Sequence, residues 1–264
     1  MTITDGTLTR LRTAATAGDA RSAFDLARLL SLVPYDPDDP DSQYEGGQSW
    51  PEEDWLRAIL DTRPSDVPAM TLLVGRLAQR IDYWLNVEEN NPDAAEDETT
   101  LEAWQGEVEE LMSRIRTADT AHTVPAQSLA ELAELLDEEA EPDDTDGDED
   151  ELAYDCYVMD DTAWSGSVAH CATIVTTCPD ELRWACDRWF SMVDGCGMSG
   201  SATLTTYVRG EEASVIDLAE HFDDTAKTLD WDAFTLPPLT GERLPAGLPV
   251  PGQGLFYGFA ATVK

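Results

Sequence analysis

The stretch DEEAEPDDTDGDEDE, from Asp137 to Glu151, decides how the chain is divided. Eleven of its fifteen residues are acidic, none is basic, and it contains no leucine, isoleucine, valine or aromatic residue. Such a segment cannot bury enough apolar surface to offset the entropy lost on ordering, and its charges repel one another. We therefore predict a disordered acidic linker over residues 137–151. It separates an N-terminal domain of residues 1–136 from a C-terminal domain of residues 152–264.

Acidity extends over the whole chain, whose 264 residues include 54 acidic and 16 basic side chains and give a formal net charge of −38. A field of this sign repels phosphate, so we expect neither nucleic acid nor an anionic membrane as a partner. A basic protein is the partner that the charge favours, although an acidic surface can also serve only to keep a protein soluble.

Localisation follows from what the sequence lacks. The opening residues MTITDGTLTR have no apolar signal-peptide core, and no apolar run is long enough for a membrane span. All five cysteines follow the linker, and their number is odd. We expect a cytoplasmic protein with reduced thiols.

The spacing of apolar residues in the first domain predicts three helical hairpins, over residues 8–30, 55–84 and 101–136. Gly18 is placed to end the first helix, and Asp19 and Asp66 are placed to cap the helices that follow them. Acidic, proline-containing loops over 33–51 and 88–99 separate the hairpins.

The turns of these hairpins align, because each pairs a small residue with a leucine three positions later: Ala23/Leu26, Ala69/Leu72 and Ala126/Leu129. On this pattern, residues 7–140 resemble tetratricopeptide or Sel1-like helical repeats. The spacings of 46 and 57 residues exceed the usual ~34 of tetratricopeptide units, and the acidic loops account for the excess. An ordinary helical bundle is the alternative, since leucine periodicity alone does not separate the two.

The resemblance implies a surface that binds a peptide or another protein. Arg76 and Arg80 are one helical step apart and are candidates to receive a partner's carboxylate, although in so acidic a chain they are also expected to pair internally. Trp84 and Trp104 are candidate anchors if they are exposed. Tryptophans on an apolar helix face usually belong to the core.

The second domain reads as mixed α and β structure. Strands are predicted over 154–159, 168–177 and 202–208, and an interior strand over 255–263. A helix over 179–193 follows Cys178, which is placed to cap it in a capping box with Glu181. Residues 214–222 are expected to form a short helix, with a strand as the alternative, and 236–254 an irregular loop. The predicted fold is a small sheet covered by one helix; no family is recognised for residues 152–264.

Cys178 is the best candidate for a reactive group, because a helix N-terminus stabilises a thiolate and His170 on the preceding strand could act as its base. A structural cap is the competing interpretation. Zinc is not expected, since the cysteines form no close ligand pairs, and the register of Gly147 does not fit a calcium-binding EF-hand loop. No nucleotide-binding or hydrolase motif is present.

These observations favour a non-enzymatic protein–protein interaction module without a cofactor, which binds its partner through the helical-repeat surface. Two alternatives stay open. One is an acidic inhibitor or immunity-type protein that neutralises a basic enzyme, and the other is a cysteine enzyme or sensor that uses Cys178.

Overall fold

The computed structural model forms two compact units. The first consists of residues 1–52, 152–244 and 256–264, and the second of residues 53–151 and 245–255. Within them the structure describes residues 3–32, 51–90, 98–121, 123–124, 129, 132, 154–165, 168–192, 202–223, 228–248 and 260–263. The predicted linker over 137–151 lies outside these residues, as do nearly all of the predicted loops over 33–51 and 88–99.

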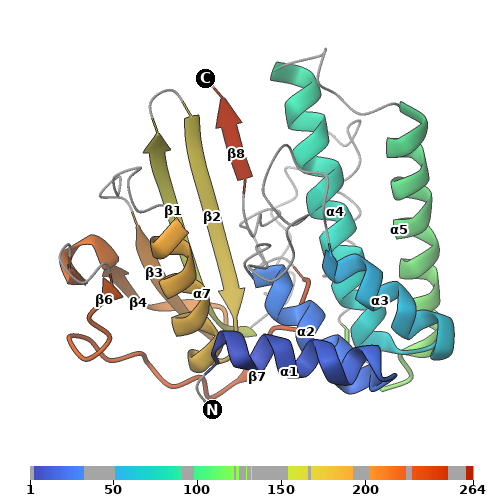
Figure 1. Cartoon of the computed structure of the whole chain (residues 1–264), viewed down its shortest axis with the longest axis horizontal. Coiled ribbons are helices and arrows are strands. Elements are labelled where there is room, and N and C mark those ends of the chain that lie inside the picture. Colours follow the sequence, from blue (N-terminus) through green and yellow to red (C-terminus); the bar gives the residue numbers. More distant parts are fainter. Residues whose placement is uncertain are drawn as a thin grey trace. The chain divides into compact units, whose positions relative to one another are not determined.

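An antiparallel sheet forms the centre of the first unit, with the strand order β4-β3-β1-β2-β8 (Figure 1). Its strands are β1 (Tyr154–Ser165), β2 (Val168–Thr176), β3 (Thr203–Val208), β4 (Glu211–Asp217) and β8 (Ala260–Val263), and the short β7 (Glu242–Arg243) pairs in parallel with β1. The predicted strands therefore exist, but β8 stands at the end of this strand order instead of in its interior. It pairs with β2 alone among the described strands.

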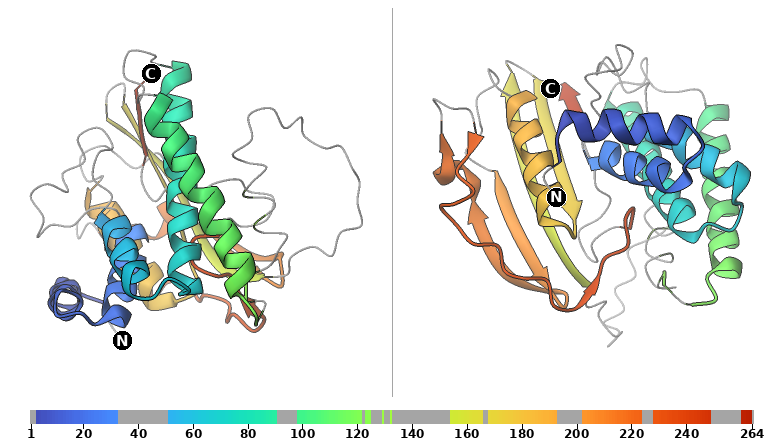
Figure 2. Two further views of the ribbon diagram at one scale, coloured as in Figure 1. Left: turned by 90° about the vertical axis from the view of Figure 1, so that its right-hand side faces the viewer. Right: turned by 60° about the horizontal axis from the view of Figure 1, so that its bottom comes forward.

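Helix α7 (Pro179–Met192) lies across one face of this sheet and contacts β1 and β2 (Figure 2). Trp189 is buried beneath it, with 1% of its surface exposed, and its Nε1 donates to the carboxylate of Asp161 on β1 at 2.8 Å. A buried indole N–H requires such a partner. The expected helix-on-sheet layer is thus confirmed.

The stretch predicted as a short helix over 214–222 is instead divided between the strand β4 and a 3₁₀ turn over Leu218–His221. A two-residue turn joins β3 to β4, and both of its residues, Arg209 and Gly210, have positive φ angles of 55° and 77°. That geometry is the hairpin turn whose twist matches the strands, so β4 folds back beside β3. Two short strands, β5 (Phe222–Asp223) and β6 (Thr228–Leu229), follow.

A buried carboxylate fixes this hairpin turn to the β7 segment. Asp155 is fully buried and accepts backbone hydrogen bonds from Arg209, Gly241 and Thr240. A Cβ on Gly241 would lie 2.6 Å from the carboxylate oxygen, so only glycine allows this approach. Burial raises the pKa of Asp155, but the three backbone N–H donors outweigh it and lower the pKa below its ordinary value.

Helices α1 (Asp5–Thr16) and α2 (Ala20–Leu32) form the predicted first hairpin. Gly18 has a φ of +93°, and the bonds Gly18 N to Ala15 O and Asp19 N to Ala14 O close a Schellman motif. Asp19 then caps α2 by accepting from the amide of Arg21 at 3.2 Å.

This hairpin belongs to the same compact unit as the sheet, and α2 contacts β2. The grouping differs from the division predicted at residue 136, and a polar contact described below also ties α2 to the start of α7.

The second unit contains α3 (Pro51–Thr62), α4 (Val67–Asn90) and α5 (Glu98–Ala118). Asp66 caps α4 as predicted, accepting from the amide of Ala69 at 3.2 Å, and α4 packs along α5 (Figure 1). The helix predicted over 126–136 lies mostly outside the described residues. The structure therefore gives a mixed α and α+β fold.

Residues 245–248 return to the second unit and pass against α4 at Gly75; we call them the returning segment. A Cβ on Gly75 would lie 1.7 Å from the carbonyl oxygen of Gly247, and a Cβ on Gly247 would lie 2.6 Å from the Cα of Leu72. Gly247 also has a φ of +94°. Two glycines thus allow backbone to touch backbone.

Candidate functional site

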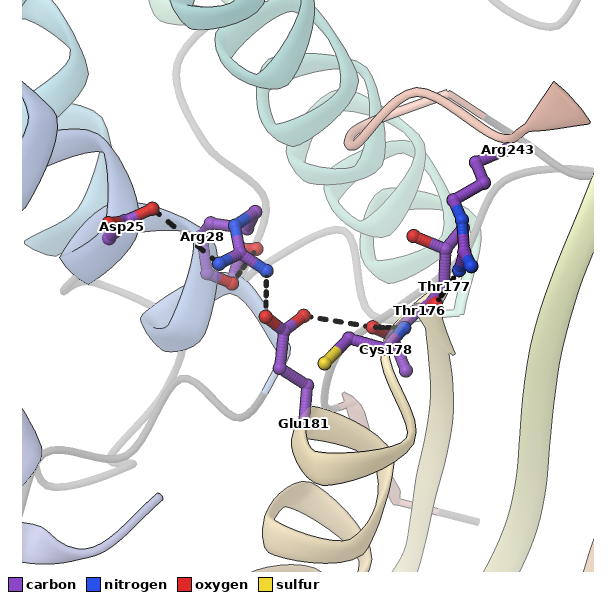
Figure 3. Close-up of polar contacts among 8 residues, drawn as sticks. Asp25, Arg28, Thr176, Thr177, Cys178, Glu181 and Arg243 are labelled. Carbon is purple, nitrogen blue, oxygen red and sulfur yellow. Dashed lines mark hydrogen bonds and ion pairs between the residues drawn. The ribbon is translucent and has the colours of Figure 1, made fainter. Parts of the chain in front are cut away.

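Two polar clusters contain the side chains singled out in the sequence, one in each unit. The first lies at the start of α7 (Figure 3). Thr176, at the end of β2, accepts from the amide of Cys178 at 3.1 Å and donates to Glu181 Oε2 at 2.9 Å. The helix begins at Pro179 as predicted, with Leu182 N donating to the carbonyl of Cys178.

This arrangement corrects the predicted capping box. A capping box requires Glu181 to accept from the amide of Cys178. In the structure this amide donates to the Thr176 hydroxyl. The Glu181 carboxylate instead points toward α2, where Arg28 donates to its Oε1 (Figure 3).

Arg28 connects the N-terminal hairpin to α7. It pairs with Glu181 and also with Asp25 at 3.6 Å. Burial works against its charge, but the two carboxylates outweigh burial and raise the pKa of Arg28 above its ordinary value. The pair is partly buried, with 26% of the Arg28 side chain and 9% of the Glu181 side chain exposed. Removing one partner alone would leave the other charge poorly solvated.

The backbone positions of His170 and Cys178, the two residues considered for an enzyme, are far apart along the chain's path. His170 lies near the start of the extended strand β2, whereas Cys178 follows its last residue by two positions, and the six steps from His170 to Thr176 span roughly 20 Å at about 3.3 Å per residue. Two further thiols, Cys156 and Cys186, are buried. Burial raises the pKa of Cys156 to about 12 and the pKa of Cys186 well above its ordinary value, so both are inert as nucleophiles.

Arg243 completes the surroundings of the α7 start, donating to the carbonyl of Thr177 (Figure 3). Its position follows from β7, which places it beside Asp155 of β1. The cluster as a whole is a structural junction of β2, β7, α7 and α2, held by four hydrogen bonds within the protein.

The second cluster lies among the helices of the other unit. The carboxylate of Glu53 on α3, with 2% of its side chain exposed, receives Arg57 at 3.0 Å and Arg80 at 3.0 Å. Arg57 also forms a two-pronged bond with Glu107 of α5, at 3.0 and 2.9 Å. These bonds to Glu107 are the largest influence on Arg57 and raise its pKa above its ordinary value.

Two of the predicted site residues meet in this cluster, because the guanidinium of Arg80 lies over the ring of Trp104 at 4.1 Å from its centroid. Such a contact stabilises a cation on an aromatic face. The expected internal pairing of Arg80 is therefore confirmed, and Trp104 is half-buried against it.

Arg76 is buried, with 2% of its surface exposed, and donates to the side chain of Gln79. It is therefore not placed on the surface for a partner's carboxylate. Trp84 belongs to α4, but its side chain falls outside the described residues. The structure thus brings Arg80 and Trp104 together within the second unit.

Sequence reasoning missed Glu53, Glu107 and Arg28, which carry the two networks. The only signal for Glu53 and Arg57 was their separation of four residues on one helix face. No local pattern marks Arg28 and Glu181, which are 153 residues apart.

Among the residues that the structure describes, no group of three or more histidine, cysteine or acidic side chains is placed to hold a metal ion. None of the described helices combines the length and the apolar character that crossing a bilayer requires. Comparison with protein-family models, with curated proteins and with solved structures found no match to this chain.

Proposed function

We propose that this chain is a non-enzymatic binding protein that captures a basic segment of another protein on the acidic surface of its helical unit. The observation that carries the proposal is the internal use of three of the unit's arginines. Arg57 and Arg80 are engaged by Glu53 and Glu107, and Arg76 by Gln79. An acidic ligand that bound to these three arginines would have to displace these contacts.

Exposed carboxylates remain on the outer faces of the same helices. Asp54 on α3 and Glu102 and Glu109 on α5 are exposed. Arg114, also on α5, donates to the carbonyl of Pro64 at 2.7 Å and pairs with Glu110 at 3.5 Å. The surface of these helices therefore carries acids that the engaged arginines do not neutralise, and such a surface attracts cationic segments.

Charge complementarity mainly changes the rate at which two proteins associate. Carboxylates at an exposed surface raise the association rate of a basic partner, and salt screens the effect. A basic enzyme is one partner of this chemistry, and binding would then inhibit it. Inhibition of a basic enzyme is thus one form of the proposed binding, and the same acidic surface favours it.

The test is capture by the immobilised full chain from the native cell extract at low and high salt, followed by kinetics on each captured protein. The variant Glu102→Gln/Glu109→Gln should slow association severalfold and leave dissociation nearly unchanged. Asp232→Asn/Glu242→Gln is the matched control, because it removes two exposed charges from the other unit.

Partners that bind the helical variant and the control at equal rates, or that bind independently of salt, would rule out this surface. If a captured partner is an enzyme, its activity in the presence of the chain decides whether the binding is inhibitory.

A further inference from the structure

Strand β4 forms one end of the sheet order (Figure 1). Within the described part of the chain it pairs with β3 and with no other strand. Its sequence, EEASVID, contains neither lysine nor proline, two residues that often protect such an edge from pairing. An edge strand of this kind presents a row of backbone donors and acceptors.

The register shows which backbone groups face outward. Leu218 N donates to Ala202 O at 2.9 Å, and the pairs 203/217, 204/216, 205/215 and 206/214 follow in order. Hydrogen-bonded and non-hydrogen-bonded pairs alternate in an antiparallel ladder. Ser214 and Ile216 therefore bond to β3, while the N–H and C=O groups of Val215 and Asp217 face away from it.

The side chains beside these groups continue the sheet's own pattern. Val158, Thr205 and Val215 lie opposite one another on β1, β3 and β4, and their exposed fractions are 1%, 9% and 52%. Val215 is the exposed large hydrophobic residue of the described chain. An apolar side chain on an added strand would cover it and extend the row.

Charge decides which strand fits. Glu211, Glu212 and Asp217 are exposed on β4. A second copy of this chain would bring the same three acids to the shared edge, where like charges are unfavourable. A segment with basic residues on both sides of an apolar one can pair its charges with these acids and cover Val215 with its apolar side chain.

We propose that the β4 edge binds an extended, basic segment of another protein by strand addition. Main-chain hydrogen bonds to Val215 and Asp217 hold the segment, and the carboxylates of β4 select its charge. The site is separate from the helical surface proposed above, and neither proposal requires the other.

The test uses the full chain and a synthetic peptide in which one central valine is flanked on both sides by lysine residues. A second peptide of the same sequence is N-methylated at every residue, which keeps its charge and removes all of its backbone donors. The unmodified peptide should bind and slow hydrogen exchange at the amides of Val215 and Asp217. The methylated peptide should not protect these amides.

Glu211→Gln/Glu212→Gln should weaken peptide binding by about 2- to 30-fold, the range for two cross-strand ion pairs. Asp232→Asn/Glu242→Gln, with the same change in net charge, should alter it far less. Equal binding of the two peptides would overturn the proposal, because the contact would then be only electrostatic. Protection of the Val215 and Asp217 amides before any peptide is added would also overturn it, because the edge would already be paired.

Discussion

At the scale of single residues, buried carboxylates perform the positioning in this protein. Glu53 on α3 pairs with Arg57 of its own helix and with Arg80 of α4. Asp161 holds the indole of Trp189, and Asp155 holds a hairpin turn. Each is buried and each accepts from a defined donor, as a charge removed from water requires. In a chain of net charge −38, the acids inside therefore serve structure, whereas the acids outside are available for binding.

Asp155 provides a direct test. Asp155→Asn should lower the free energy of unfolding at pH 7 by about 2–4 kcal/mol, because charge-assisted bonds to buried amides are lost. The folded pKa of Asp155 is lowered, so its contribution is complete above the ordinary value of 3.8 and is lost as pH falls below it. Chemical denaturation from pH 7 to pH 3 should show the difference between the two proteins shrinking below about pH 4. A difference that is constant over this range would contradict the account.

At the scale of elements, hydrophobic spacing predicted α1 to α5 and α7 well, because each helix has a buried face and most have a recognisable start or stop. Gly18, Asp19 and Asp66 lie where the turns require them. Residues 214–217 were harder, because a strand at a sheet edge with outward-facing acids lacks the apolar alternation of a half-buried strand.

The candidate site was less predictable than the elements. Arg80 and Trp104 were selected on helix faces, but their contact across α4 and α5 depends on packing that no local pattern encodes. The carboxylate that holds Arg80 comes from a third helix, α3. Cys178 was placed correctly at the start of a helix, and the length of β2 is what separates it from His170.

The approach of Gly247 to α4 tests packing at this scale. Gly247→Ala should cost roughly 2–4 kcal/mol, because the positive φ is unfavourable for alanine and its Cβ would lie 2.6 Å from backbone. Gly106→Ala is the control, since no heavy atom lies within 4 Å of its Cβ position and alanine favours a helix. Thermal or urea unfolding should show the first variant destabilised and the second unchanged or stabilised. Equal effects would show that the returning segment does not pack on Leu72.

At the scale of the whole molecule, the first compact unit is assembled from chain segments that are distant in sequence. Helix α2 and the start of α7 meet through Arg28 and Glu181, and the compact unit that contains the sheet also contains residues 1–52. Sequence reasoning placed a boundary at the acidic stretch from composition, and composition carries no information on which helices pack on which sheet.

Cutting the chain tests this grouping. A specific protease site inserted at Gly147 should yield fragments that remain associated in gel filtration after cleavage, because the α1–α2 hairpin stays packed in the sheet unit. Arg28→Ala should promote their separation, since Glu181 would lose its partner, whereas Arg21→Ala on the exposed side of α2 should not. Immediate dissociation of the unmodified fragments into two stable domains would support the division at residue 136.

The distance between Arg28 and Glu181 also sets an order of events during synthesis. At about 5–20 residues per second, the ribosome needs roughly 8–30 s to make the 153 residues that separate them. The hairpin α1–α2 therefore leaves the ribosome before the sheet has been translated, and its apolar face stays uncovered during that time. The first helices to be synthesised are thus among the last to pack in the folded unit. During that interval they are the part of the nascent chain most exposed to chaperone binding.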